Sequence, residues 1–155
     1  MMASGGKAAE FWAEFCAASG IDPREPYQVW YFGNTPEMAR ELAELVLTGT
    51  KTASASLAAV NEVKPDEAPI LGGYSVVTDM GSEPICVIRT TEIRHMAFAD
   101  VDTSFAFDEG EGDRTLEYWR AVHNSYFARE SADLGIAFDD GSIVCCERFE
   151  LLYPR

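Results

Sequence analysis

The spacing of apolar residues predicts two helices in the first third of the chain. Residues 8–19 carry apolar side chains along one helical stripe. A second stripe follows Thr35, which is suited to cap a helix, and Pro36, which is tolerated at a first helical position. Gly49 is suited to end this helix. The chain is therefore expected to turn from helix to sheet directly after Gly49.

The rest of the pattern predicts short strands. Extended segments are expected at residues 27–32, 74–79, 84–94 and 142–153, with 74–79 and 84–94 paired as a hairpin. Residues 54–59 fit a strand and a helix equally well. Helices and strands do not alternate in the regular rhythm of a parallel sheet. We therefore expect an α+β fold with a small, mostly antiparallel, barrel-like sheet.

An acidic segment precedes the last expected helix. Residues 96–112 are typical of a loop with one short helical turn, and Asp113 is expected to cap a helix over residues 114–131. Its expected buried face comprises Leu116, Trp119, Tyr126 and either Val122 or His123. Residues 105–113 mix four acids with two glycines. Such a segment fits a solvated loop, but glycines also let a backbone approach a ligand closely.

Length and composition indicate one folded unit. The chain has 155 residues and an ordinary hydrophobic content of 47%. Residues 1–26 are expected to form an N-terminal helix and connector, and residues 27–155 the main domain. There is no signal-peptide pattern and no apolar run long enough to span a membrane, so we expect a cytoplasmic protein.

The cysteines and histidines give no pattern of a metal or disulfide site. The four cysteines form no CxxC pair, and neither histidine has a metal-ligand partner at useful spacing. We therefore expect reduced cysteines, no metal and no cofactor.

The charge of the chain limits its partners. Acids outnumber Lys and Arg by 26 to 12, which gives a net charge of −14, and no basic cluster is present. Proteins that bind long nucleic acids neutralise phosphates with basic side chains. We therefore expect no tight binding of long RNA or DNA, whereas a single nucleoside or a short RNA end remains a possible partner.

The segment after Gly49 holds the strongest candidate chemistry. Lys51 is one of only three lysines, and it is followed by several hydroxyl side chains. Unlike arginine, lysine can be made to give up its proton. An amine three residues before Ser54 could activate that hydroxyl as a nucleophile. By spacing alone, a helix end followed by a polar strand is the simpler interpretation.

Several segments together resemble the ASCH-domain family, whose fold is related to PUA domains. The resemblance covers roughly residues 27–153 and is closest to the larger bacterial members. It implies a mixed, mostly antiparallel β-barrel flanked by helices, with a cleft lined by the lysine motif. The segments that carry it are Trp30–Gly33, Gly49–Ser54, Pro84–Ile93, Glu109–Asp113, Leu116–Arg120 and Val144–Phe149.

The resemblance also implies a site. Small members with a similar motif are amidohydrolases that remove the acyl group from N4-acylated cytidine, with a lysine, a threonine three residues later and a glutamate. By motif these correspond to Lys51, Ser54 and Glu111. Serine replaces threonine here, and Glu109 is the alternative acid. The substrate-binding candidates are Phe32, Gly49, Thr52, Glu109 and Trp119.

Two assignments of roles follow for an amidohydrolase. Ser54 attacks the amide while Lys51 accepts its proton, or Lys51 stays charged and stabilises the oxyanion while Glu111 is the base. An ionised Glu111 close to Lys51 would raise the lysine pKa and so oppose the first assignment. The alternative function is a module that binds RNA or a modified nucleoside, or a ribonuclease, without amidohydrolase activity.

Overall fold

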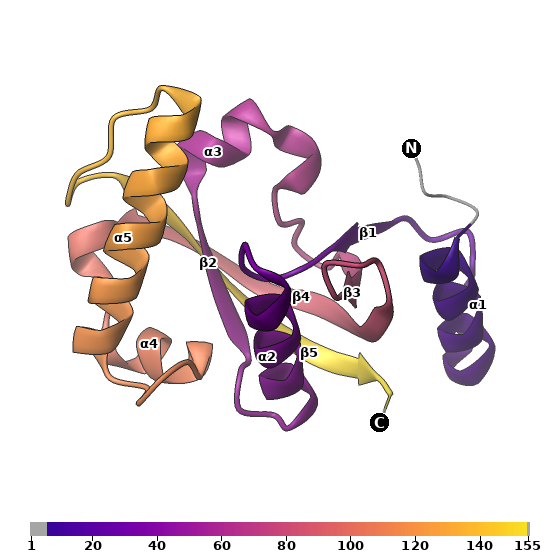
Figure 1. Cartoon of the computed structure of the whole chain (residues 1–155). Helices are drawn as coiled ribbons and strands as arrows, with labels where there is room; N and C mark the ends of the chain where they lie inside the picture. The colour runs from indigo at the N-terminus through magenta and orange to yellow at the C-terminus, as the bar shows by residue number, and fades with distance from the viewer. Residues whose placement is uncertain (1–5, 155) are drawn as a thin grey trace.

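Five strands and five α-helices make up the described part of the chain, residues 6–154 of the computed structural model (Figure 1). The strands are β1 (Tyr27–Trp30), β2 (Ala53–Leu57), β3 (Tyr74–Thr78), β4 (Pro84–Ala97) and β5 (Ile143–Tyr153). The helices are α1 (Lys7–Ser19), α2 (Pro36–Leu47), α3 (Ala58–Val63), α4 (Thr103–Glu109) and α5 (Leu116–Leu134). Short 3₁₀ turns occupy Pro65–Glu67 and Phe98–Asp100.

The strands form one mixed sheet in the order β1-β3-β4-β5-β2. Three neighbouring pairs are antiparallel, and β1 and β3 are parallel. The α+β class and the mostly antiparallel sheet are thus confirmed. Closure into a barrel is not confirmed, because β1 and β2 stand at the two edges of the sheet in the pairing of the described strands.

The helices cover the sheet in separate groups (Figure 1). Helix α1 packs at one end against β3 and β4, where Trp12 and Phe15 join Val76 and Val87 in a buried cluster. Helix α2 packs near the middle through Ala43 and other residues. Helices α4 and α5 cover the other end. Helix α1 therefore lies at the opposite end of the sheet from α4 and α5.

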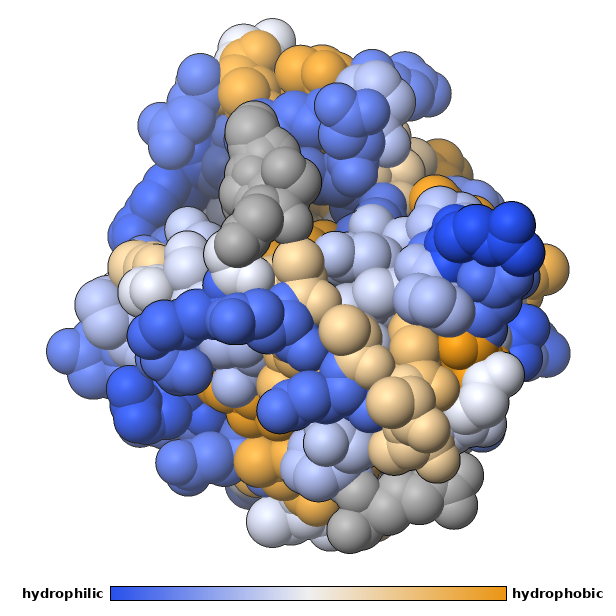
Figure 2. All heavy atoms as spheres, turned by 90° about the vertical axis from the view of Figure 1, so that its right-hand side faces the viewer, coloured by the Kyte–Doolittle hydropathy of each residue, from blue (hydrophilic) through white to orange (hydrophobic). Residues whose placement is uncertain are grey.

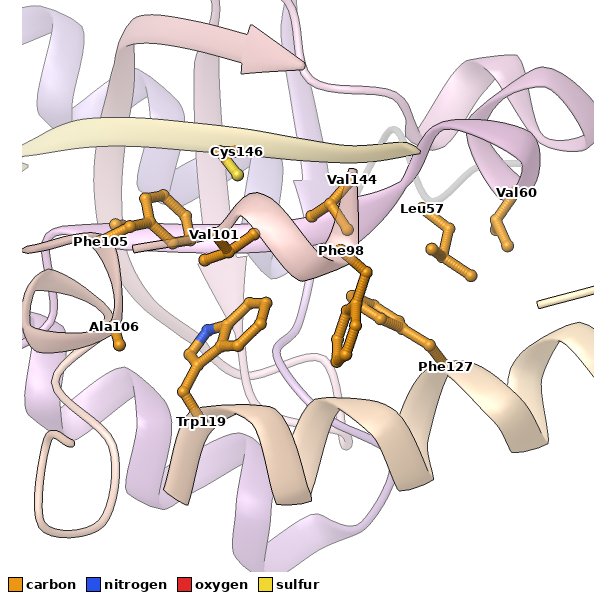
Figure 3. Close-up of a cluster of buried hydrophobic side chains, with 11 residues drawn as sticks. Leu57, Val60, Phe98, Val101, Phe105, Ala106, Trp119, Phe127, Val144 and Cys146 are labelled. Carbon is orange, nitrogen blue, oxygen red and sulfur yellow. The ribbon is translucent and has the colours of Figure 1, made fainter. Parts of the chain in front are cut away.

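The cluster under α5 is the most aromatic part of the core (Figure 3). Trp119 and Phe127 project from α5 toward the sheet and enclose Phe98. The rings of Phe98 and Trp119 are stacked with centroids 5.5 Å apart. Burial of each such ring contributes about 1.5–3 kcal/mol. This packing fixes α5, and with it every side chain that α5 presents to the rest of the molecule.

Hydrophilic side chains cover most of the face that carries α1, with small apolar patches between them (Figure 2). None of the described helices combines the length and apolar character needed to cross a membrane. All four cysteines are buried free thiols. Burial raises the pKa of Cys86 and Cys146 to about 12, so these thiols stay protonated and act as core residues.

Three sequence-based expectations need correction. The ambiguous segment 54–59 divides, with β2 ending at Leu57 and α3 beginning at the next residue. The acidic segment contains a full helix, α4, whose first turn is capped by Asp102. Asp113 does not cap α5: the cap is Thr115, and Asp113 holds it by accepting bonds from its backbone N–H and hydroxyl.

The expected buried face of α5 is only partly correct. Trp119 and His123 are buried, but Leu116 and Tyr126 are only partly covered. Phe127 and Ser131 complete the buried stripe instead. The buried residues recur every four positions, and four residues span slightly more than one turn of 3.6 residues, so the buried stripe winds slowly around the helix.

Gly110 fixes the contact between α4 and the start of β2. It caps α4 with φ +74°, and a Cβ atom there would lie 2.4 Å from the carbonyl oxygen of Thr50. Gly135 caps α5 with φ +70° and open space around it. These two glycines therefore differ in packing but share a backbone conformation.

We expect Gly110→Ala to destabilise the protein more than Gly135→Ala. Both variants carry the left-handed backbone strain of about 1–2 kcal/mol, and only Gly110→Ala adds a clash, worth about 1–3 kcal/mol more. Urea unfolding of the two variants beside wild type measures the difference. Equal losses would show that the Thr50 backbone yields freely and that the contact is not fixed.

Candidate functional site

A tight reversal at the end of α2 turns Lys51 into the protein. The backbone N–H groups of Thr50 and Lys51 both donate to the carbonyl of Leu45, at 2.9 and 3.0 Å. The next residue, Thr52, donates its N–H to Asp108 of α4 at 2.8 Å. These bonds leave the Lys51 side chain only 1% exposed. A lysine so deeply buried requires partners for its charge.

Four acceptor oxygens surround the Lys51 ammonium. Nζ lies 2.9 Å from the carbonyl of Ala53, 2.8 Å from Glu109 Oε1 and 2.7 Å from Glu111 Oε2, and the backbone carbonyl of Glu109 is a longer contact at 3.3 Å. An ammonium has three N–H donors and no acceptor, so these bonds satisfy it. In this state Lys51 has no lone pair with which to accept a proton.

Glu109 connects Lys51 to α5. Its Oε2 accepts a hydrogen bond from Trp119 Nε1 at 2.6 Å and lies 3.2 Å from His123 Nε2. Both partners lie on α5, four residues apart, and so on one face of the helix. Glu109 is itself only 1% exposed. With both oxygens occupied and no access to solvent, it is a structural centre of the cluster.

His123 has an acceptor at each ring nitrogen. Nδ1 lies 2.9 Å from the carbonyl of Trp119, and Nε2 faces the Glu109 carboxylate. A neutral imidazole has one N–H, whereas the imidazolium has two. Burial lowers the pKa of His123, but the charge and hydrogen bond of Glu109 outweigh that and hold it above its usual value. The charged form is therefore favoured.

The pKa values of Lys51 and Glu109 shift in opposite directions from their ordinary values. Burial lowers the pKa of Lys51, but attraction to Glu109 and Glu111 outweighs it and raises the net value. For Glu109 burial acts to raise the pKa, and the positive charges of Lys51 and His123 reverse that effect and lower it. Lys51 thus stays protonated and Glu109 stays ionised.

Glu111 differs from Glu109 in its access and its titration. Its side chain is 17% exposed, and its one hydrogen bond among the described residues is the bond that Oε2 accepts from Lys51. Burial and the charge of Glu109 raise its pKa more than Lys51 lowers it. Glu111 is therefore the acid of the cluster best placed to exchange a proton with a group in the cavity.

The cluster forms one wall of a cavity of about 640 Å³. The cavity lies among α2, α5, β2 and the segment after β1. Its polar walls are Glu41, Glu44, Thr48, Lys51, Ser54, Glu109, Glu111 and His123. Its other walls are Trp30, Tyr31, Phe32, Gly33, Met38, Leu42, Leu45, Ala55, Gly112, Tyr118, Val122 and Tyr126. The cavity offers aromatic walls and one charged corner, as small-molecule sites commonly do.

The structure brings five of the expected residues to this cavity. They are Phe32, Lys51, Ser54, Glu109 and Glu111. The Phe32 ring centre lies 5.2 Å from Lys51 Nζ. Among the described hydrogen bonds, none joins Ser54 to Lys51 or to either carboxylate of the cluster.

Three expected substrate-binding residues lie elsewhere. Trp119 is buried in the core and reaches the site only through its bond to Glu109. Gly49 and Thr52 do not line the cavity, and Thr52 faces α4. For these three residues the structure provides no direct contact with a ligand in the cavity.

Sequence reasoning missed the role of His123 and overlooked Glu147. His123 was expected only as one of two alternatives on the buried face of the last helix, and its contact with Glu109 was not foreseen. The signal was its position four residues after Trp119 on the buried face of a helix that follows the acidic segment. Glu147, a buried acid of β5, gave no signal beyond a charged residue within an apolar strand.

The acidic cluster does not fit a metal ion. Ligand atoms of Glu109, Glu111 and His123 lie within 4.8 Å of one another. Lys51 Nζ is hydrogen-bonded to both carboxylates, and His123 favours its protonated form, which cannot ligate a metal. The ammonium supplies the positive charge that a cation would bring.

The open mixed sheet and the lysine–glutamate cluster at its edge define an ASCH-type domain. The family model of the ASCH domain matches residues 28–153. The chain belongs to the ASCH-domain family. No curated protein matches it.

Solved structures support the same assignment. An ASCH domain from Lactobacillus crispatus has a TM-score of 0.86 and 29% identity, over 96% of each chain. A protein from Enterococcus faecalis has a TM-score of 0.83 and 34% identity, over 94% of this chain and 88% of that one. A hypothetical protein, PH0355, shares the fold alone, with a TM-score of 0.52 and 16% identity over 80% of this chain and 99% of that one.

We expect His123 to make stability depend on pH. Its pKa is raised in the folded state, so its contribution is fully present below the unfolded pKa of about 6.5 and is lost as pH rises through the folded pKa. The free energy of unfolding of wild type, minus that of His123→Gln, should fall with pH by at most about 1.4 kcal/mol per unit. Chemical unfolding between pH 6 and 9 measures it. A flat difference would show that folding leaves the pKa of His123 unchanged, and a difference that rises with pH would show that folding lowers it.

Proposed function

We propose that this protein hydrolyses the amide of an N4-acylated cytidine or a related acylated nucleoside. The observation that carries the proposal is the placement of Glu111. Its carboxylate reaches the cavity while bonded to the buried ammonium of Lys51. This supplies a base whose pKa is raised beside a fixed positive charge, as amide hydrolysis requires.

In the proposed reaction, Glu111 takes a proton from a water molecule that attacks the acyl carbonyl. Protonation of Glu111 weakens its bond from Lys51, and the released N–H can then stabilise the negative oxygen of the tetrahedral intermediate. Glu111 next gives its proton to the departing amine nitrogen as the carbon–nitrogen bond breaks. The products are the free amine of the nucleoside and a carboxylic acid, and Glu111 is again ionised.

Lys51 is assigned the electrostatic role and not that of a base. Its three donors are occupied and its pKa is raised. This favours the second of the two role assignments considered from sequence. Ser54 lies on the cavity wall with no base in hydrogen-bond contact, so we assign it to binding of the substrate and not to attack.

The cavity suits a nucleoside better than a polynucleotide. Its volume of about 640 Å³ is within the range of small-ligand sites, and Trp30, Phe32 and Tyr118 offer rings against which a base can pack. Glu41 and Glu44 add negative charge to the walls. Lys51 is the only lysine or arginine among the described lining residues, and its charge is already paired with Glu109.

We expect wild type to hydrolyse N4-acetylcytidine and Glu111→Gln to lose at least about 100-fold in kcat/KM. Glutamine keeps the size of the side chain but cannot accept the proton. Ser54→Ala should lose about tenfold, because it removes one hydrogen bond. Absorbance at the cytidine band follows the reaction, and melting temperatures show that each variant is folded.

Glu117→Gln, an exposed site on α5 away from the cavity, is the matched control and should keep full activity. Lys51→Ala is a poor first variant, because removal of one partner of a buried ion pair costs about 3–5 kcal/mol. No turnover of any acylated cytidine by wild type would refute the proposal. A loss in Ser54→Ala as large as that in Glu111→Gln would replace water by the Ser54 hydroxyl as the attacking group.

A further inference from the structure

A second buried carboxylate, Glu147, lies beside the cavity and has no part in the proposed reaction. It stands on β5 directly opposite Ser54 of β2. Residues opposite each other in an antiparallel pair project to the same face, with Cβ atoms about 4.5–5.5 Å apart. Ser54 lines the main cavity, so Glu147 projects on the cavity side of the sheet. The residue is only 5% exposed.

One oxygen of Glu147 is bound and the other is free. Oε2 accepts a short hydrogen bond from the Thr90 hydroxyl, which fixes the carboxylate. Oε1 has no protein partner among the described residues. Among the described residues, the Ser131 hydroxyl is the only side-chain polar atom that is fully sealed from solvent and has no hydrogen-bond partner. Because Oε1 of Glu147 also lacks a partner but is not such an atom, it is open to a cavity. A buried carboxylate oxygen without a partner is costly unless something donates to it.

That oxygen meets a side chamber of about 120 Å³ that adjoins the main cavity. The two spaces share Trp30, Ser54 and Ala55. The chamber is smaller than an engineered cavity of about 150 Å³ that binds benzene, so its size suits a short polar group at one end of a ligand. The two spaces are thus neighbours, and we take a ligand in the main cavity to extend one end into the chamber.

The chamber carries negative charge that no basic side chain among its described walls offsets. Two carboxylates, Glu67 and Glu147, line it. The amide nitrogen of Gln28, another lining residue, already donates to the carbonyls of Asp66 and Ala68. No lysine or arginine is among its described walls. Such a chamber favours ligand groups that donate N–H or O–H bonds.

We propose that Glu147 is a specificity-determining residue, whose free oxygen accepts a hydrogen bond from an N–H or O–H group of the ligand in the side chamber. The inference rests on the proposed function in taking that ligand to be a nucleoside. A nucleoside offers such donors at two places, the hydroxyls of its ribose and the amino group of its base. The Ser54 hydroxyl, beside Glu147, can take part in the same recognition.

The first test is calorimetric titration with cytidine, the product of the proposed reaction. Glu147→Gln keeps the shape and an oxygen for Thr90 but replaces the free acceptor by an NH₂ donor. We expect its affinity to fall at least about tenfold. Glu150→Gln, an exposed site on the same strand, is the matched control and should bind like wild type. Glu147→Asp, which withdraws the charge by one methylene, is the second variant if the first does not fold.

A double cycle, in which the ligand and Glu147 are changed separately and together, shows whether Glu147 contacts the ligand or only supports the local structure. The ligand probes are 2′,3′,5′-trideoxycytidine, which lacks all the hydroxyl donors of the sugar, and N4,N4-dimethylcytidine, which lacks the N–H donors of the base. The probe that lacks the group bound by Glu147 should bind wild type more weakly than cytidine does. The same probe should bind Glu147→Gln as well as cytidine binds that variant. That result identifies the sugar or the base as the source. Equal losses in both proteins for both probes would overturn the inference, because Glu147 then touches neither donor.

The outcomes also separate this inference from the proposed function. Absence of hydrolysis, with the cycle as expected, refutes the amidohydrolase and leaves the role of Glu147 in binding. Hydrolysis by wild type with unchanged kcat/KM and cytidine affinity in Glu147→Gln refutes the role of Glu147 alone. No measurable binding of cytidine to wild type overturns the inference as well.

Discussion

The ion pair between Lys51 and Glu109 is the interaction on which the site depends. Both side chains are almost fully buried, and their atoms lie 2.8 Å apart. A charge so deep in a protein is tolerated only when it is paired and fully hydrogen-bonded. Backbone bonds from Thr50 and Lys51 to Leu45 and from Thr52 to Asp108 bring the two elements together, and Trp119 and His123 hold Glu109 from α5. The sheet, α2, α4 and α5 thus meet at one pair of charges.

Glu109 and Glu111, which are only two residues apart in the chain, have different roles in this arrangement. Glu109 is closed off and has partners at both oxygens, so it stabilises the positive charge of Lys51. Glu111 has access to the cavity and a raised pKa, so it can exchange a proton. A carboxylate that titrates beside a lysine that does not titrate is a combination suited to general base catalysis with electrostatic stabilisation. In the proposed reaction, Glu111 is chosen as the base on its access and hydrogen bonding and not on its distance along the chain.

The position of α2 and the two segments that form the site could be predicted from the sequence, because their local signals were strong. Thr35, Pro36 and Gly49 define α2 as expected, and the motif pointed to Lys51 and to the acidic segment. The cap at Thr115 and the helix α4 were missed, since Asp113 and Asp102 offer similar local capping signals. The choice between Glu109 and Glu111 could not be made, because it depends on the position of α5. Glu147 was invisible for the same reason: its place opposite Ser54 is a property of strand register, which joins residues far apart in the chain.

The most direct test of the central claim is the ionisation of Lys51, measured by nitrogen-15 NMR of the lysine side chains. With only three lysines, the Lys51 signal can be assigned by substitution of Lys7 and Lys64. The account predicts a protected ammonium signal that persists above pH 10.5, the ordinary value for lysine, because Glu109 and Glu111 raise its pKa. A midpoint well below that value would show a lysine able to act as a base, and it would contradict the assignment of proton transfer to Glu111.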